Sequence, residues 1–542
     1  MKYLLLLICI TSLFACQQPQ ADLIIKNAKI YTVNNQFDTA SVMVIKDGKF
    51  IAIGNEQLLS QYKADSMLDA EGQYIYPGFM DAHCHFTGYA KDQYKLALFG
   101  TKSFAEVIEK LNAYALTNKR AWIEGRGWDQ NDWENKNFPV KDTLDVLFPN
   151  TPVFLMRIDG HAILCNQKAL DLAQIDQNTK ITGGEVEIVN GKLTGMLFDN
   201  AVDLMKKVLP PRTSDEIIQD FVQAEQACVR LGLTSIVDCG INKSTVENLQ
   251  TAYKENKLQI RSAVMLSDEK ENYDTYLHQK PYRDDKMHIV GYKVYADGAL
   301  GSRGAYLLDA YSDKHNHYGY LLTPIDSMQS IAQKVYQTNY QLCTHAIGDK
   351  ANREILKIYA SVLKEKNDRR WRIEHAQVLN QLDFHLFGDY SIIPSVQPTH
   401  ATSDMYWAKD RIGPERIKFA YAYKQLLTQN NWLPLGTDFP VESLNPLYTY
   451  YAAVFRVDKN MYPTEGFEKE NALDRIDALK GITIWAAKSV FEEDVKGSIE
   501  PGKMADFVIV PIDLLHADAK SIYNATISQT FIGGKKVYQQ TK

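Results

Sequence analysis

Tyr76-Pro-Gly-Phe-Met-Asp-Ala-His-Cys-His85 is an apolar run that ends in two histidines separated by one residue. Successive side chains of a β-strand point to opposite faces, so His83 and His85 share one face and Cys84 lies on the other. Two neutral imidazoles on one face can bind one cation, such as zinc. A His-x-His pair alone is weak evidence for a metal site. The remaining ligands must come from other parts of the chain.

Seven further apolar runs of strand length alternate with segments of helical pattern. Together with residues 75–80 they are residues 235–237, 260–266, 289–294, 341–343, 371–373, 392–396 and 433–435. Such alternation predicts a parallel α/β sheet, and eight strands are the number in a closed (β/α)8 TIM-like barrel. The alternative is an open doubly wound sheet, but the chain lacks the glycine-rich dinucleotide loop typical of that fold.

The two ends of the chain have a different pattern, that of short antiparallel strands. The turn Lys46-Asp-Gly-Lys49 between apolar runs indicates a hairpin. Strands at both ends predict one small composite β-sandwich, joined to the barrel at Pro77-Gly78. A long insertion after the first barrel strand is a candidate lid or substrate subdomain. The predicted domains are residues 22–75 with 497–540 (sandwich), 76–100 with 214–496 (barrel) and 101–213 (insertion).

Residues 1–15 have the pattern of a lipoprotein signal peptide. Met1-Lys2-Tyr3 carries positive charge, and the apolar run that follows is too short to span a bilayer. Leu13-Phe-Ala-Cys16 resembles the lipobox, in which the signal is cut before a cysteine that is then acylated. The alternative is an ordinary cleaved signal peptide with Cys16 incidental. We expect lipidation of Cys16 and anchoring at the cell envelope, in the periplasm or outer membrane of a bacterium.

The composition is that of a globular protein, with 45% hydrophobic and 11% aromatic residues among 542, which argues against disorder. The net charge is −6 with both signs well mixed, so the expected partner is a small-molecule substrate, not nucleic acid. A membrane would be contacted only through the lipid anchor. Five further cysteines are interpreted as small buried hydrophobes and not as a disulfide framework; they are Cys84, Cys165, Cys228, Cys239 and Cys343.

Four more candidate metal ligands occur in or directly after predicted strands. They are Lys293, His345, His375 and Asp438. Catalytic groups of an α/β barrel lie at the carboxyl ends of its strands. Four histidines, one lysine and one aspartate can therefore converge on one point. Only twelve histidines occur in the whole chain, which makes this distribution hard to ascribe to chance.

The ordered set of motifs resembles the amidohydrolase superfamily and, within it, the YtcJ-like amidohydrolase-3 group. The resemblance covers nearly the whole chain after the signal. Its carriers are His83-x-His85, Trp128-Asp129, Asp159-Gly-His161 with Asn166, Lys293 to Arg303, His345-Ala-Ile-Gly-Asp349, Glu374-His375, Gly436-Thr-Asp438 and Gly497 to Phe507. Any single motif is unspecific, whereas the ordered set is highly specific.

The resemblance implies a centre of divalent metal, most often zinc, with one or two ions. One ion would be bound by His83, His85 and Asp438, and the second by His345 and His375. Lys293 would bridge the ions after carboxylation by carbon dioxide, because a free ammonium has no lone pair for a cation. Without that carbamate, a single ion at the first three ligands is the alternative. The group also suggests a homodimer.

The implied reaction is hydrolysis of a non-peptide carbon–nitrogen bond in a small amide or N-acyl substrate. A bound cation lowers the pKa of water from 15.7 to about 7, and the resulting metal-bound hydroxide would attack the carbonyl. Asp438 would accept the proton and pass it to the leaving nitrogen, with Lys293 and His345 as the other catalytic residues. The alternatives are an esterase or lactonase on the same scaffold and a catalytically idle lipoprotein that binds small ligands.

Four residues are candidate substrate contacts, namely Trp128, His161, Arg303 and His400. The structural alternatives are that Trp128 packs in the core of the insertion, that Arg303 pairs with a structural carboxylate and that His400 lies on a loop. We expect Asp81 and Asp349 to orient ligands or brace loops, not to bind metal.

Overall fold

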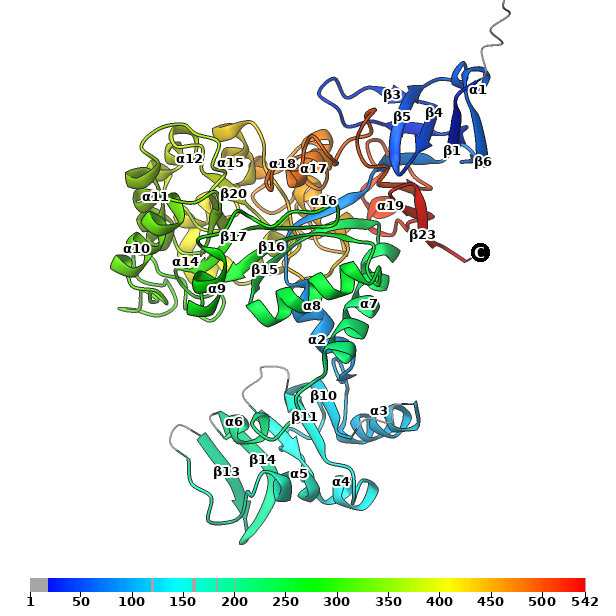
Figure 1. Cartoon of the computed structure of the whole chain (residues 1–542). Coiled ribbons are helices and arrows are strands. Elements are labelled where there is room, and N and C mark those ends of the chain that lie inside the picture. The colour runs from blue at the N-terminus through cyan, green and yellow to red at the C-terminus, as the bar shows by residue number, and fades with distance from the viewer. Residues whose placement is uncertain (1–17, 118–120, 158–161, 182–183, 200, 542) are drawn as a thin grey trace, which may run out of the picture. The chain divides into compact units, whose positions relative to one another are not determined.

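The computed structural model describes residues 18–117, 121–157, 162–181, 184–199 and 201–541 (Figure 1). The predicted signal peptide, Cys16 and His161 lie outside these residues. No described helix is both long and apolar enough to cross a bilayer. The chain divides into two compact units, a barrel unit of Met1–Phe86 with Glu225–Lys542 and an insertion unit of Thr87–Ala224. The predicted domain boundaries stay a prediction.

A parallel sheet of seven strands forms the barrel, as the alternating pattern predicts. In spatial order the strands are β8 (Phe79–Cys84), β15 (Leu233–Ile241), β16 (Arg261–Ser267), β17 (Met287–Tyr295), β18 (Gln341–Ala346), β19 (Arg372–His375) and β20 (Ile393–Ser395). The segments between them carry α8 (Lys243–Lys254), α9 (Lys270–Tyr276), α10 (Ile325–Tyr336), α11 (Asp349–Leu363) and α12 (His385–Asp389). The α/β barrel prediction is confirmed.

The eighth predicted strand, residues 433–435, closes the barrel without forming a regular strand. On one side the Ala82 N–H donates to Leu435 O at 3.1 Å. On the other side the Gly436 N–H donates to Val396 O at 3.0 Å, and Val396 pairs with Leu435 in a parallel bridge. The segment therefore occupies the place of a strand between β8 and β20. We call this junction the seam.

The C-terminal part of the barrel unit is mainly helical. Its helices are α13 (Pro398–Asp404), α14 (Ala408–Arg416), α15 (Tyr423–Asn430), α16 (Pro446–Phe455), α17 (Arg475–Gly481), α18 (Ile484–Lys488) and α19 (Ala519–Tyr523). The Asn445 side chain caps α16 by accepting from the Leu447 N–H at 3.0 Å, which satisfies a donor that the first helical turn leaves free.

Both ends of the chain contribute strands to one six-stranded sheet. Its order is β23 (Lys535–Gln539), β22 (Gln529–Ile532), β21 (Phe507–Val510), β7 (Tyr74–Pro77), β2 (Lys29–Tyr31) and β3 (Thr39–Ala40). A four-stranded sheet comprises β5 (Lys49–Gly54), β4 (Val42–Lys46), β1 (Gln20–Lys26) and β6 (Lys63–Asp69). Residues of the two sheets, such as Met43 and Phe507, share one buried apolar cluster.

Residues 75–80 do not form one barrel strand, so this prediction was wrong. They divide between β7 of the terminal sheet and β8 of the barrel, with Gly78 between them. A Cβ atom at Gly78 would lie 2.2 Å from Thr234 Oγ1, so a residue with a side chain would clash there. The close approach of β15 to this point explains why the chain changes sheets at a glycine.

The insertion unit folds around its own six-stranded sheet. The strand order is β13 (Gly184–Val189), β14 (Lys192–Asp199), β12 (Ala162–Cys165), β11 (Val153–Arg157), β10 (Ile123–Trp128) and β9 (Leu96–Ala97). Its helices include α3 (Phe104–Thr117), α4 (Asp142–Leu147), α5 (Gln167–Leu172) and α6 (Val202–Lys206). Leu111, Trp128 and Leu155 belong to its buried apolar core.

Candidate metal centre

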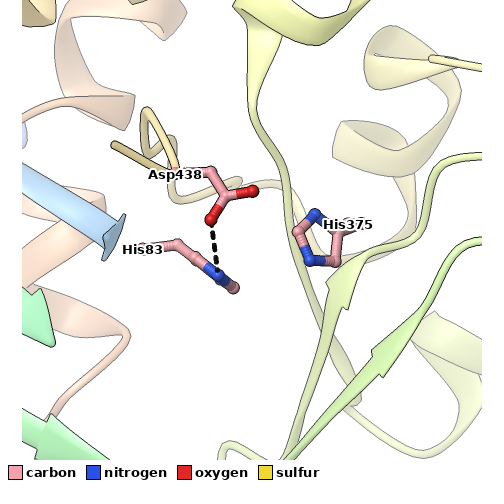
Figure 2. Close-up of side chains that lie close together, drawn as sticks. All are labelled: His83, His375 and Asp438. Carbon is pink, nitrogen blue, oxygen red and sulfur yellow. Dashed lines mark ion pairs between the residues drawn. The ribbon is translucent and has the colours of Figure 1, made fainter. Parts of the chain in front are cut away.

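Six predicted side chains gather at the carboxyl ends of the barrel strands. They are His83 at the end of β8, His85 just after it, Lys293 on β17, His345 on β18, His375 on β19 and Asp438 just past the seam. Figure 2 shows His83, His375 and Asp438, each of which offers one ligand atom within 4.8 Å of the others. Asp438 Oδ1 lies 3.5 Å from His83 Nε2 and 3.2 Å from His85 Nε2.

In His83, His85 and His375, a hydrogen bond at Nδ1 fixes the orientation of the imidazole ring. The partners are Glu374 Oε2 at 2.5 Å from His83, Cys239 O at 3.0 Å from His85 and Gln397 Oε1 at 2.8 Å from His375. Each partner is an oxygen that accepts the proton of Nδ1, which leaves the lone pair on Nε2. That tautomer is the form in which an imidazole binds a metal.

Lys293 and His345 complete the cluster. Lys293 is fully buried, with Nζ 3.2 Å from His83 Nε2 and 5.2 Å from the centre of the Tyr295 ring. The rings of His345 and His375 meet edge to face at 4.5 Å. Burial, followed by the charge of Lys293, lowers the pKa of His345 to about 3. His345 is therefore neutral at physiological pH, as a metal ligand must be.

Two members of the cluster have unusual backbone conformations. Asp438 has φ 61° and His375 has φ 75°, in the left-handed region that residues other than glycine rarely adopt. Such strain is typical of functional sites, where the surrounding structure enforces it. Burial would raise the pKa of the Asp438 carboxyl, but the adjacent imidazoles of His83 and His85 hold it well below its usual range. The Asp438 carboxyl is thus ionised, as a carboxylate that binds a metal must be.

The donor set fits a divalent cation. His345 Nε2, His400 Nε2 and Asp438 Oδ1 are buried atoms without a hydrogen-bond partner among the described residues. A buried polar atom without a partner costs about 1–3 kcal/mol, so three of them in one cluster indicate a ligand for this place. Imidazole nitrogens with a carboxylate are the ligands that zinc and similar ions prefer.

Among the candidate substrate contacts, His400 lies at this centre. Its Nε2 is 3.6 Å from Asp438 Oδ2, and its ring stacks on that of His375 at 5.9 Å. Arg303 instead pairs with Asp313 through two hydrogen bonds of 3.0 and 2.8 Å. This pairing is the structural alternative that the sequence left open.

Trp128 has the contacts of a core residue of the insertion unit. Its indole is 1% exposed, donates to Leu155 O at 3.0 Å and packs against Trp133. Asn166, another motif residue, caps α5 by accepting from the Ala169 N–H. Both residues thus stabilise this unit locally, and a substrate contact of Trp128 stays a prediction.

Asp81 and Asp349 brace the structure, as expected. Asp81 is buried on β8 and accepts from the Thr437 N–H at 3.0 Å and the Thr437 hydroxyl at 2.6 Å, which fastens the seam beside His83. Asp349 accepts from the Leu308 N–H at 2.9 Å. A Cβ atom at Gly436 would lie 2.5 Å from His83 N, so only glycine permits this approach.

Glu374 is a functional candidate that the sequence placed in a motif but to which it assigned no role. It is fully buried, holds His83 Nδ1 and forms an ion pair with the equally buried Arg372 at 2.7 Å. Burial would raise its pKa, but the charge of Arg372 and the hydrogen bond from His83 hold that pKa well below its usual range. The Arg372 guanidinium also donates to Ala82 O and to Ser395 Oγ. Glu374 thus positions His83 within a rigid network that joins β8, β19 and β20.

We expect Glu374→Gln to weaken metal binding by about 10–100-fold, the usual cost of removing such a supporting carboxylate. It should also lower the free energy of unfolding by about 3–5 kcal/mol, because Arg372 is left as an unpaired buried charge. Metal content at defined free zinc and chemical unfolding measure the two effects. Glu493→Gln is the control. Glu493 lies outside the centre, and its Oε1 pairs with Arg370 Nη2 at a distance of 2.7 Å. If the wild type, Glu374→Gln and Glu493→Gln bound metal with equal affinity, Glu374 would be a purely structural residue.

A cavity of about 380 Å³ opens over the centre. His85, Lys293, His345, His375 and Asp438 contribute to its lining, together with His400. Its apolar wall includes Leu300, Ile347, Trp407 and Val441. A cavity of this size, with polar groups that converge on one centre and an apolar wall, is typical of small-molecule sites.

Comparison with known proteins identifies the family. The amidohydrolase family model matches residues 66–538. The putative amidohydrolase YtcJ of Bacillus subtilis is 29% identical over 94% of this chain and 98% of its own length, and an N-substituted formamide deformylase of Arthrobacter pascens is 23% identical over 96% and 99%. A metal-dependent hydrolase from Pyrococcus horikoshii has a TM-score of 0.79 at 28% identity, covering 92% of this chain and 99% of its own. The chain therefore belongs to the amidohydrolase family and is an enzyme, a metal-dependent amidohydrolase.

Proposed function

We propose that the protein hydrolyses the carbon–nitrogen bond of a small amide or N-acyl compound. The observation that carries this proposal is a cluster of six side chains at one cavity. Five of them line the cavity, namely His85, Lys293, His345, His375 and Asp438, and the buried His83 lies against Asp438 and Lys293. The similarity to a formamide deformylase over nearly the full length supports an N-acyl amine as the substrate class. The apolar wall of the cavity supports a compound with a nonpolar group next to the amide.

The residues that would hold metal follow from their contacts. His83, His85 and Asp438 would bind one ion, and His345 and His375 a second, with zinc as the expected metal. Lys293 would join the two sites as a carbamate, in which Nζ forms a bond to the carbon of carbon dioxide and releases one proton. A bound divalent ion polarises the substrate carbonyl and lowers the pKa of a water molecule.

The protein's own groups would move the protons. Asp438 would accept a proton from the attacking water and return it to the leaving nitrogen, as a general base that becomes a general acid. Its Oδ2 lies 3.6 Å from His400 Nε2, so His400 is placed to donate a hydrogen bond to oxygen that develops negative charge. The low pKa of Asp438 keeps it in the basic form before reaction.

The test combines metal removal with a substrate panel. We expect the purified protein to contain bound metal, to lose about 100-fold or more of its activity when a chelator strips it, and to regain activity with zinc and bicarbonate. Hydrolysis rates are then compared for N-formyl, N-acetyl and cyclic imide compounds and for a matched ester. A protein without bound metal, and without activity recoverable by added metal, would contradict the proposal. Faster hydrolysis of the ester than of the amides would show that the enzyme cleaves a carbon–oxygen bond instead of a carbon–nitrogen bond.

A further inference from the structure

A second cavity, which we call the aromatic groove, adjoins the catalytic cavity. It measures about 400 Å³, and its lining includes Tyr406, Tyr448, Tyr451, Tyr523, Ser403 and Glu442. Glu442 also lines the catalytic cavity. The helix α13 contributes to both cavities, His400 and Asp404 to the catalytic one and Ser403 to the groove. Glu442 thus lies in the wall of both cavities.

The tyrosines of the groove form a preorganised aromatic wall. The rings of Tyr448 and Tyr523 stack at 4.5 Å with an interplanar angle of 4°, and Tyr451 meets Tyr523 at 5.2 Å and 66°. Tyr406, on the other hand, is 58% exposed. The faces of such rings carry negative electrostatic potential, which attracts cations as well as apolar groups.

The junction of the two cavities carries a carboxylate available to a ligand. Glu442 is half-buried, and its Oε1 accepts from the Ser403 hydroxyl at 2.5 Å; among the described hydrogen bonds Oε2 has none. Asp458, in contrast, is engaged by the Tyr406 hydroxyl and by the backbone of its own loop. The exposed Lys459 is the basic residue of the groove lining. Glu442 therefore sets a negative charge where the groove meets the catalytic cavity.

We propose that the aromatic groove binds the distal arm of the substrate, and that this arm carries a protonated amine held against Glu442. The inference rests on the proposed amide hydrolysis and narrows its substrate class to N-acyl compounds with a cationic end. An uncharged arm would also contact the tyrosine rings, but it would leave the Glu442 carboxylate without a counter-charge on desolvation. The combination of ring faces with one carboxylate favours an alkylammonium group.

The test uses matched pairs of substrates. Each pair is an N-acetyl-α,ω-diaminoalkane with three to six methylenes and the N-acetylalkylamine of equal length, which lacks the charge. With the metal-loaded full-length protein we expect kcat/KM to favour the charged member of the best pair at least tenfold. Glu442→Gln should reduce this preference to about twofold, mainly by lowering kcat/KM for the charged member. Glu365→Gln, which alters an exposed carboxylate outside both cavities, should keep the wild-type ratio.

Tyr406→Leu provides a second variant that does not touch the junction. We expect it to lower kcat/KM about threefold for the charged compounds and less for the neutral ones, because it removes one ring face. Equal rates for both members of every pair in the wild type would overturn the inference while leaving amide hydrolysis intact. A preference that survives in Glu442→Gln would also overturn it.

Loss of the proposed function can be told apart from loss of the groove site. If no member of any pair is hydrolysed, binding of the same pairs is measured by calorimetry, since binding does not require turnover. At least tenfold tighter binding of the charged members, abolished in Glu442→Gln, supports the groove site even then. Equal dissociation constants within each pair would reject it.

Discussion

Lys293→Ala is expected to lower kcat/KM by about a thousandfold or more and to reduce the bound metal to one ion or fewer per chain. Lys293 is fully buried, and its Nζ lies 3.2 Å from His83 Nε2. Alanine there cannot become a carbamate, so nothing would join the two sets of histidines. Metal analysis, steady-state kinetics and circular dichroism check the three components, namely metal content, turnover and retained fold.

Two matched variants separate the carbamate from simple packing. Lys293→Met keeps the volume but cannot be carboxylated, so it should lose activity as alanine does. A short carboxylate such as propionate should restore part of the activity to Lys293→Ala, where space is free, and none to Lys293→Met. Lys357→Ala, an exposed lysine on α11, serves as the control. Full activity and an unchanged metal content in Lys293→Ala would remove the carbamate bridge from the mechanism.

Asp438→Asn is expected to reduce kcat by about a thousandfold, because the amide cannot accept a proton and is a weaker metal ligand. The fold should survive, since asparagine tolerates the left-handed backbone that Asp438 adopts at φ 61°. Pre-steady-state and steady-state kinetics measure the loss, and a thermal melt tests the fold.

The comparison with His400→Asn sharpens this prediction. His400 lies 3.6 Å from Asp438 Oδ2, so it is the nearest alternative group for the proton. If Asp438 transfers the proton, His400→Asn should cost much less turnover than Asp438→Asn. The reverse order, with turnover intact in Asp438→Asn, would assign the proton to His400.

The fold could be predicted from the sequence because the periodicity of apolar residues and the order of strands and helices can be read from neighbouring residues along the chain. Alternation of strands and helices predicts the barrel, and apolar runs mark its strands. Local patterns do not show at which residue the chain leaves one sheet and enters another. Residues 75–80 look like one strand, yet they serve two sheets because Gly78 packs against Thr234, a contact between distant segments. Residues 433–435 likewise pair on both sides with irregular geometry.

The part of the site that could be predicted is the set of residues at the carboxyl ends of the barrel strands. His83, His345, His375 and Asp438 are close together, as convergence at the barrel mouth requires. Glu374 escaped because regular alternation would place it on the face opposite His375. The left-handed backbone at His375 breaks that alternation, so that Glu374 reaches His83 while His375 still joins the cluster.

Exposed or inserted residues were the least predictable part of the site. Arg303 stands in a motif beside candidate ligands, yet it pairs with Asp313. Nothing in a single sequence distinguishes an arginine that binds a substrate from one that binds a neighbouring loop. Similarly, the burial of Trp128 in the insertion core follows from packing that its motif does not encode.

The seam has a consequence for the order of events during folding. The Asp81–Thr437 contact that fastens it joins residues 356 positions apart, and the candidate ligands His83 and Asp438 flank that contact. Contacts of such long sequence separation are slow to form, so these two ligands meet only after nearly the entire barrel has been synthesised. We therefore expect a complete candidate metal site to form late in folding, after the segment around Thr437 has joined β8.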